Sequence, residues 1–241
     1  MSKTPLLIVG AGGHGRVVRD LLQTTKSYWL ALVADDKLSH TELRDGVYYG
    51  PVALMRDLIA NETDAAAAVI GIGDNRIRRE MSIRLELPDK RYAALIHPEA
   101  SVAKDAVIGH GAVVMAGAIV NTGAVIGPHA IVNSGAVVEH DCTVGAFAHI
   151  SPRVALAGGV RVMEGAHVGI GACVIQGISI GRWSILGAGA AAIADVPDGV
   201  TAVGVPARVI KQQTMQQPHL TNQDIYPKFT ENSEISLLRN I

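Results

Sequence analysis

Residues 102–127, with the sequence VAKDAVIGHGAVVMAGAIVNTGAVIG, contain the pattern from which the fold is predicted. Every sixth residue in it is aliphatic, and this spacing continues without a break through fifteen positions, from Val102 to Leu186. The residue four positions later is usually small, as at Ala106 and Ala112. A short fixed period of this kind indicates a solenoid of stacked repeats. A set of ordinary buried strands would have broken the register.

A hexapeptide period predicts a triangular parallel β-helix in which three hexapeptides make one coil. The aliphatic side chains would fill the axis of the prism, and the small residues would occupy its crowded corners. Glycine often follows the aliphatic residue, as at Gly109 and Gly127. Its conformational freedom suits the turns between strands.

Residues 6–95 have a different pattern, in which apolar runs alternate with amphipathic segments. This alternation predicts a small parallel sheet with helices on its faces, a Rossmann-like α/β domain. We therefore expect a nucleotide-binding domain over residues 1–95, a β-helix over 96–210 and a polar extension over 211–241. The expected strands are 6–9, 29–33, 66–72 and 92–96, and the expected helices are 16–23, 51–59 and 77–85.

Composition excludes several classes of protein. The 241 residues carry 21 basic and 22 acidic side chains, so the net charge of −1 argues against nucleic acid or an anionic membrane as partner. No apolar run approaches the roughly 18 residues of a membrane-spanning helix, and no membrane insertion is expected. Two cysteines, Cys142 and Cys173, form no disulfide framework, which suits a reducing cytoplasm. We interpret Cys142 as a packing residue.

The glycine-rich segment GAGGHG, residues 10–15, lies between an expected strand and an expected helix. Glycines there let the backbone approach a phosphate, and the helix terminus offers N–H donors. Asp35 and Asp36 end the next strand, where an acid can reach a ribose. The domain is only half the size of a dinucleotide fold, so a mononucleotide sugar fits better than NAD. The alternative is a tight turn without a ligand.

Together, the glycine-rich turn, the two aspartates, Gly73-Asp74-Asn75 and the hexapeptide repeat resemble the sugar O- and N-acyltransferases of the sialic-acid O-acetyltransferase type. In pattern the chain is most similar to bacterial N-acetyltransferases of nucleotide-linked 4-amino-4,6-dideoxy sugars. The resemblance spans residues 5–210. It implies a left-handed β-helix, a homotrimer, and acetyl-CoA bound between neighbouring β-helices.

The resemblance also implies roles for single residues. The pair His140-Asp141 matches the family's catalytic stretch, with His140 as general base and Asp141 fixing its tautomer. Such neighbours can act together only at a corner of the prism, because consecutive strand residues point to opposite faces. The implied nucleotide-sugar contacts are Gly12, Gly13, His14, Asp35, Asp36, Gly73 and Asn133. The implied acetyl-CoA contacts are His149, Gly158, Ile170 and Ala188.

The remaining histidines have simpler interpretations. His167 lies one coil beyond His149, so the two rings should stack. His97, His110 and His129 are expected to be solvated surface residues.

The resemblance predicts direct acetyl transfer from acetyl-CoA to a sugar amine, with no metal. Three alternatives stay open at this point. A sugar O-acetyltransferase would need the same histidine and the same CoA groove. A γ-type carbonic anhydrase would bind zinc through three histidines. A nucleotide-sugar-binding scaffold would have no activity.

Overall fold

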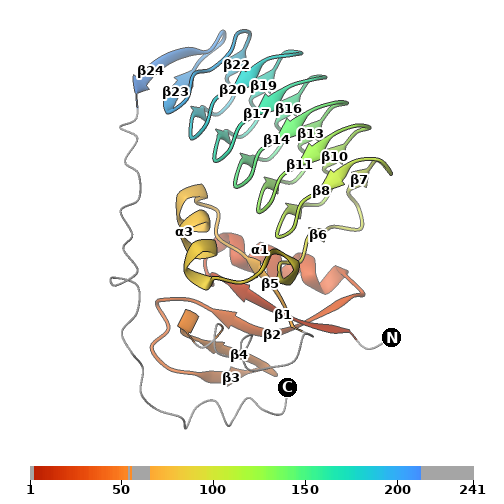
Figure 1. The fold of residues 1–241 in the computed structure, drawn as a ribbon, viewed down its shortest axis with the longest axis vertical. Helices are drawn as coiled ribbons and strands as arrows, with labels where there is room; N and C mark the ends of the chain where they lie inside the picture. The colour runs from red at the N-terminus through yellow and green to blue at the C-terminus, as the bar shows by residue number, and fades with distance from the viewer. Residues whose placement is uncertain (1–2, 54, 56–65, 213–241) are drawn as a thin grey trace.

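The computed structural model describes residues 3–53, 55 and 66–212. An N-terminal α/β domain lies against one side of a long triangular prism (Figure 1). The five-stranded sheet of the N-terminal domain has the order β3-β4-β2-β1-β5. Its strands are parallel except for β3, which is antiparallel to β4. The elements of the domain are β1 (Thr4–Val9), α1 (Gly13–Thr24), β2 (Tyr28–Ala34), β3 (Glu42–Arg44), β4 (Val47–Gly50), β5 (Ala67–Ile70), α3 (Asn75–Leu85) and the 3₁₀ helix η1 (Asp89–Arg91).

The central strand β1 is buried on both faces, as a parallel strand between helices should be. Leu7 and Val9 pack in one cluster with Met81 and Leu85 of α3. The alternate residues Leu6 and Ile8 pack in a second cluster with Val18, Leu21 and Leu22 of α1. That second cluster also contains Val113 and Met115 of the prism, so the two domains share a core.

The prism is a left-handed parallel β-helix, which confirms the expected fold class. Each two-residue strand pairs in parallel with the strand eighteen residues further on, as Val137 does with Ala155. Three sheets result, which we name after their first strands. The β6 sheet holds β6, β9, β12, β15, β18, β21, β23 and β24, the β7 sheet holds β7, β10, β13, β16, β19 and β22, and the β8 sheet holds β8, β11, β14, β17 and β20.

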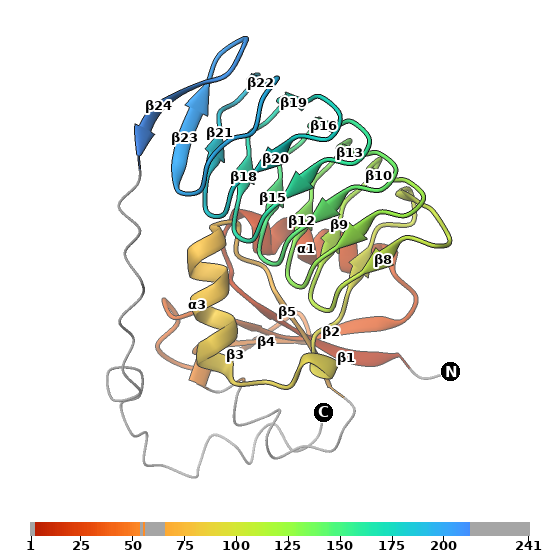
Figure 2. The same ribbon diagram turned by 45° about the horizontal axis from the view of Figure 1, so that its top comes forward.

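The strands follow one another at six-residue intervals around the prism (Figure 2). They are β6 (Leu95–Ile96), β7 (Ser101–Val102), β8 (Val107–Ile108), β9 (Val113–Val114), β10 (Ile119–Val120), β11 (Val125–Ile126), β12 (Ile131–Val132), β13 (Val137–Val138), β14 (Thr143–Val144), β15 (His149–Ile150), β16 (Ala155–Leu156), β17 (Arg161–Val162), β18 (His167–Val168), β19 (Cys173–Val174), β20 (Ser179–Ile180), β21 (Ile185–Leu186) and β22 (Ala191–Ala192). The antiparallel pair β23 (Val200–Val203) and β24 (Arg208–Gln212) closes the far end.

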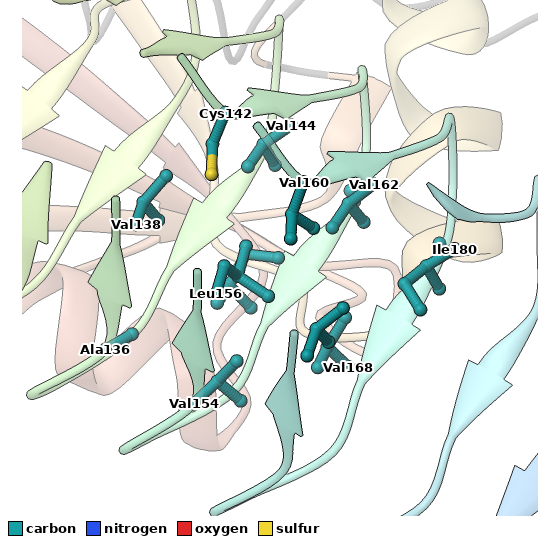
Figure 3. Packing of buried hydrophobic residues seen from close by; sticks show 14 of the residues in the cluster. Ala136, Val138, Cys142, Val144, Val154, Leu156, Val160, Val162, Val168 and Ile180 are labelled. Atoms are coloured by element: carbon teal, nitrogen blue, oxygen red, sulfur yellow. The ribbon is translucent and has the colours of Figure 1, made fainter. Parts of the chain in front are cut away.

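The interior of the prism is a column of aliphatic side chains with small residues at the corners (Figure 3). Val138, Val144, Ile150 and Leu156 are at most 1 % exposed, and so is the corner residue Ala136. The packing interpretation of Cys142 is confirmed. It is fully buried among these residues, and its Sγ donates to the Ala157 carbonyl at 3.1 Å.

One expected strand needs correction, one hairpin was not expected, and two expected segments lie largely outside the described residues. Residues 92–96 do not form one strand of the N-terminal sheet. Tyr92 makes a single bridge to Ala68, and Leu95–Ile96 begins the β-helix instead. The hairpin of β3 and β4 had no counterpart in the sequence analysis. The expected helix 51–59 falls largely outside the described residues, as does the extension beyond residue 212.

Within the described part of the chain, no helix is long and apolar enough to cross a bilayer.

The turn between β1 and α1 depends on Gly15. A Cβ there would overlap the Gly10 carbonyl oxygen and approach Gly71. We expect Gly15→Ala to destabilise the fold by about 1–3 kcal/mol, because backbone atoms must move apart. Gly13→Ala is the matched control. Its Cβ would meet nothing within 4 Å, so stability should be unchanged or raised by up to about 1 kcal/mol. Denaturant unfolding of both variants checks this, and equal midpoints would contradict it.

Candidate functional site

His140 and Asp141 lie at the corner of the prism between the β7 and β8 sheets, which we call the dyad corner. Asp141 has a left-handed backbone conformation with φ of 59°. The turn brings neighbouring side chains together, and His140 Nδ1 donates to Asp141 Oδ2 at 2.8 Å. The expectation that the pair meets at a corner is thus confirmed. Since Nδ1 carries the proton, Nε2 of His140 can act as an acceptor.

Glycines in the adjacent coils make room for this pair. Gly123 lies eighteen residues before Asp141, and a Cβ on it would come within 2.6 Å of Asp141 Oδ1. Gly158 lies eighteen residues after His140, and a Cβ on it would overlap the imidazole. The predicted acetyl-CoA residue Gly158 is therefore next to the predicted base.

The dyad is open to solvent in the single chain. The side chains of His140 and Asp141 are 59 % and 73 % exposed. The hydrogen bond that His140 donates to the Asp141 carboxylate raises the pKa of His140 above its ordinary value. A raised pKa makes the imidazole a stronger base, provided that the pH is high enough to leave it neutral.

A second group of predicted residues meets where the two domains join, and we call His14, Gly73, Asn133 and His149 the junction site. The rings of His14 and His149 are 6.3 Å apart. Asn133 Nδ2 donates to His149 Nε2 at 3.1 Å. A Cβ on Gly73 would lie 3.7 Å from that of His14. Residues from both domains, separated by at least 60 positions in the sequence, therefore lie close together.

Burial keeps these imidazoles neutral. Desolvation, followed by the charge of Arg78, lowers the pKa of His14 to about 4. Desolvation also lowers the pKa of His149 to about 3, with His167 and Arg78 contributing. The predicted stack of His149 on His167 is confirmed, with ring centroids 4.9 Å apart and an interplanar angle of 4°. Ser151 Oγ contacts His167 Nε2 at 2.9 Å. A neutral imidazole can both donate and accept a hydrogen bond.

The glycine-rich turn leads into this site. A Cβ on Gly12 or Gly13 would meet nothing within 4 Å, so the backbone before α1 is accessible. Asp35 supports the turn, since its Oδ2 accepts from the Ala11 N–H at 2.7 Å and its Oδ1 from the Lys37 N–H at 3.0 Å. Asp36 forms a two-pronged ion pair with Arg84, at 2.5 and 2.7 Å. Both aspartates that were predicted to meet the ribose or base thus have protein partners as well.

The corner between the β8 and β6 sheets carries the N-terminal domain, and we call it the docking corner. His129 is part of it, and the expectation that this histidine is solvated is wrong. It is 4 % exposed, stacked on Phe147 at 5.0 Å and in edge contact with Tyr92 at 4.5 Å. Helix α3 covers this corner, because its buried face places Asn75 and Arg78 against the coils.

Sequence reasoning missed Asn75 and Arg78 as contacts between domains. Arg78 shares the buried face of α3 with Met81 and Leu85, three and seven residues further on. A charged residue at a core position of an amphipathic helix is unusual unless it is paired. The position of Arg78 on the apolar face of this helix was the one sequence feature that could have indicated the contact.

The predicted site residues on the β-helix and at its junction with the N-terminal domain therefore divide among three places. His140, Asp141 and Gly158 share the dyad corner, whereas the junction site lies across the β7 sheet from it. Ile170 and Ala188 lie at the remaining corner, between the β6 and β7 sheets. Both are exposed, and Gly189 N–H donates to the Ile170 carbonyl at 2.8 Å.

Among the residues that the structure describes, no three His, Cys, Asp or Glu side chains are placed to hold a metal ion.

Comparison with known proteins gives the family. The PglD N-terminal domain model matches residues 5–85. The chain is 48 % identical over 109 residues to UDP-N-acetylbacillosamine N-acetyltransferase of Bacillus subtilis, an alignment that covers 45 % of this chain and 50 % of that enzyme. The alignment thus spans half the length of this curated relative.

Two groups of solved structures match over nearly their whole length. A single-residue variant of perosamine N-acetyltransferase from Caulobacter crescentus, in complex with CoA and GDP-perosamine, is 37 % identical with a TM-score of 0.78, covering 88 % of this chain and 99 % of that one. The acetyltransferase domain of PglB from Neisseria gonorrhoeae, in complex with acetyl coenzyme A, is 36 % identical with a TM-score of 0.76, covering 87 % and 100 %. The chain belongs to the hexapeptide-repeat sugar acyltransferases, within the branch of nucleotide-sugar N-acetyltransferases.

Proposed function

We propose that this protein transfers acetyl from acetyl-CoA to the 4-amino group of a nucleotide-linked 4-amino-4,6-dideoxy sugar. The observation that carries the proposal is the hydrogen-bonded pair His140-Asp141 on a β-helix whose relatives are N-acetyltransferases. Those relatives act on UDP- and GDP-linked amino sugars by their names, which favours an amine acceptor over the hydroxyl of the O-acetyltransferase alternative.

The chemistry assigned to the chain's own residues is a proton transfer. As the sugar nitrogen bonds to the acetyl carbon and the carbon–sulfur bond breaks, the nitrogen loses one proton. Nε2 of His140 accepts it, and the CoA thiolate takes up a proton on leaving. Asp141 accepts from Nδ1–H of His140, so that the neutral ring presents its lone pair at Nε2.

The junction site is assigned to the sugar nucleotide. The accessible backbone at Gly12 and Gly13, at the start of α1, suits the diphosphate. The neutral ring of His14 suits a hydroxyl group of the sugar, because a neutral imidazole can accept a hydrogen bond as well as donate one. His149, the expected acetyl-CoA contact, lies beside it. Ile170 and Ala188 offer the exposed surface for acetyl-CoA.

The separation of the two half-sites supports a trimer. In one chain the dyad corner is exposed and lies away from the N-terminal domain, whose described contacts fall on the docking corner and the β6 sheet. A threefold axis parallel to the prism and outside it would place the dyad corner of one copy against the junction site of the next. We propose that three copies assemble in this way and that acetyl-CoA binds between them.

The substrate assignment is tested by thiol release from acetyl-CoA with UDP-, GDP- and dTDP-linked 4-amino sugars. We expect turnover with one of these amines and none with free sialic acid, which represents the hydroxyl acceptors. The acceptor that supports turnover will identify the nucleotide of the sugar, and we propose that its acetylated product serves the synthesis of a surface glycan or glycoprotein. Turnover of sialic acid alone would overturn the assignment.

His140→Ala should lower kcat by about 10²- to 10⁴-fold, the usual contribution of a general base. Its unfolding midpoint should match that of the wild type, because the side chain is exposed. His110→Ala is the matched control, since His110 also lies at a turn beside a carboxylate, with Nε2 3.3 Å from Asp89 Oδ1. It should keep wild-type kcat.

Asp141→Asn adds a test of the pH dependence. Loss of the carboxylate removes the interaction that raises the pKa of His140. At acid pH, kcat/KM falls because His140 becomes protonated. This fall should therefore move to lower pH in the variant. The maximal rate should also decrease. A His140→Ala enzyme within a few-fold of wild type, or a fall at acid pH that does not move, would exclude the base assignment.

The trimer proposal is tested by mixing two inactive variants. His140→Ala damages the dyad corner, and Asn133→Ala damages the junction site. If each active centre takes one half-site from each of two copies, random mixed trimers should regain about a quarter of wild-type activity. Co-expression followed by purification of the mixed species provides the measurement. Activity no higher than that of the parent variants would show that one copy supplies both half-sites.

A further inference from the structure

The guanidinium of Arg78 is buried at the domain junction with all five of its N–H donors in use. The residue is 1 % exposed. Nε donates to the His129 carbonyl at 2.9 Å, and Nη1 donates to the carbonyls of Ile72 and Gly73 at 2.8 and 3.1 Å. Nη2 donates to Asn75 Oδ1 and to the Phe147 carbonyl, both at 2.8 Å. Every acceptor is a neutral oxygen, and four of the five belong to the backbone.

Asn75 extends this network to a third coil. Its Nδ2 donates to the carbonyls of Gly165 and Ala166 at 3.1 and 3.2 Å. The residues His129, Phe147 and Gly165 are eighteen positions apart and occupy the same place in three successive coils. Together, Asn75 and Arg78 therefore bind a ladder of carbonyl groups along the docking corner. We call this pair the clamp.

The clamp connects that ladder to the nucleotide-sugar half of the junction site. Its other acceptors, Ile72 and Gly73, belong to the segment that follows β5 and faces His14. The planar guanidinium of Arg78 thus binds Gly73 on one side and two coils of the β-helix on the other. A change in its geometry would move Gly73 and His14 relative to Asn133 and His149, which the β-helix carries.

The apolar contacts of Val113 and Met115 also join the two domains, and they do so without burying a charge. Burial lowers the pKa of Arg78 to about 10, because removal from water disfavours the cation. An apolar interface tolerates sliding, whereas five directional hydrogen bonds define one orientation.

Resting on the proposed function, we infer that Asn75 and Arg78 are positioning residues for the sugar nucleotide. They fix the angle of the N-terminal domain on the β-helix and so assemble the junction site from its two halves.

Three variants test this. Arg78→Lys keeps the charge but loses the planar fork, because an ammonium has only three donors. Asn75→Ala keeps Arg78 and removes the link to the third coil. Arg79→Met is the matched control from the same helix. It deletes a half-exposed ion pair, Arg79 Nε to Glu164 Oε1 at 3.5 Å, which also joins the two domains.

Steady-state kinetics distinguish positioning from general destabilisation. For Arg78→Lys and Asn75→Ala we expect KM for the nucleotide sugar to rise about ten-fold or more, as loss of charged hydrogen bonds predicts. KM for acetyl-CoA should stay within about two-fold of wild type, because its proposed contacts lie on the β-helix. Arg79→Met should change neither KM. A fall in kcat with both KM values unchanged would show a merely structural role and overturn the inference.

Small-angle X-ray scattering of the same proteins reports the domain arrangement without any substrate. Wild type and Arg79→Met should give superimposable curves, and the two clamp variants should give a larger radius of gyration. If wild type acetylates none of the amino sugars, the proposed function fails, and scattering alone then decides on the clamp. Folded clamp variants with wild-type curves would overturn it. Should Arg78→Lys fail to fold, Asn75→Ala provides both measurements.

Discussion

Hydrogen bonding between residues eighteen positions apart governs the whole β-helix. Each strand donates to the coil above it, so that every residue has a fixed neighbour directly over and under it, as Val137 has Ile119 and Ala155. Function is built from the same columns. Gly123 and Gly158 lie under and over the dyad, His149 lies under His167, and three stacked carbonyls form the ladder that α3 grips. Because the backbone sets these columns, a side chain can be aligned with another merely by its place in the repeat.

This regularity explains why so much could be predicted from the sequence. The six-residue aliphatic period specifies three sheets and a filled axis, and the structure has both. The stack of His149 on His167 followed from counting eighteen residues. The meeting of His140 with Asp141 followed from placing the pair at a turn.

What escaped prediction has a common physical cause. Asn75 and Arg78 bind backbone carbonyls. Since every residue has a backbone carbonyl, residue types do not show which of them will accept a hydrogen bond from another domain. His129 looks like a turn histidine and is one, but the docked helix and Tyr92 cover it. The same limit applies to Asp35, whose partner is the N–H of Ala11. Contacts between domains depend on how two surfaces meet, and neither periodicity nor spacing describes that.

The place of the dyad within the row of coils determines how stably its backbone is held. In a solenoid each coil is stabilised mainly by its two neighbours, so local opening starts at the ends and travels inward. The coil that carries His140 and Asp141 lies near the middle of the run from β6 to β22, and the β23–β24 hairpin covers one terminus. Side chains of helix α3 also form hydrogen bonds to three central coils and hold them together. The pair therefore rests on the portion of the molecule that is last to fray, although its side chains are open to solvent.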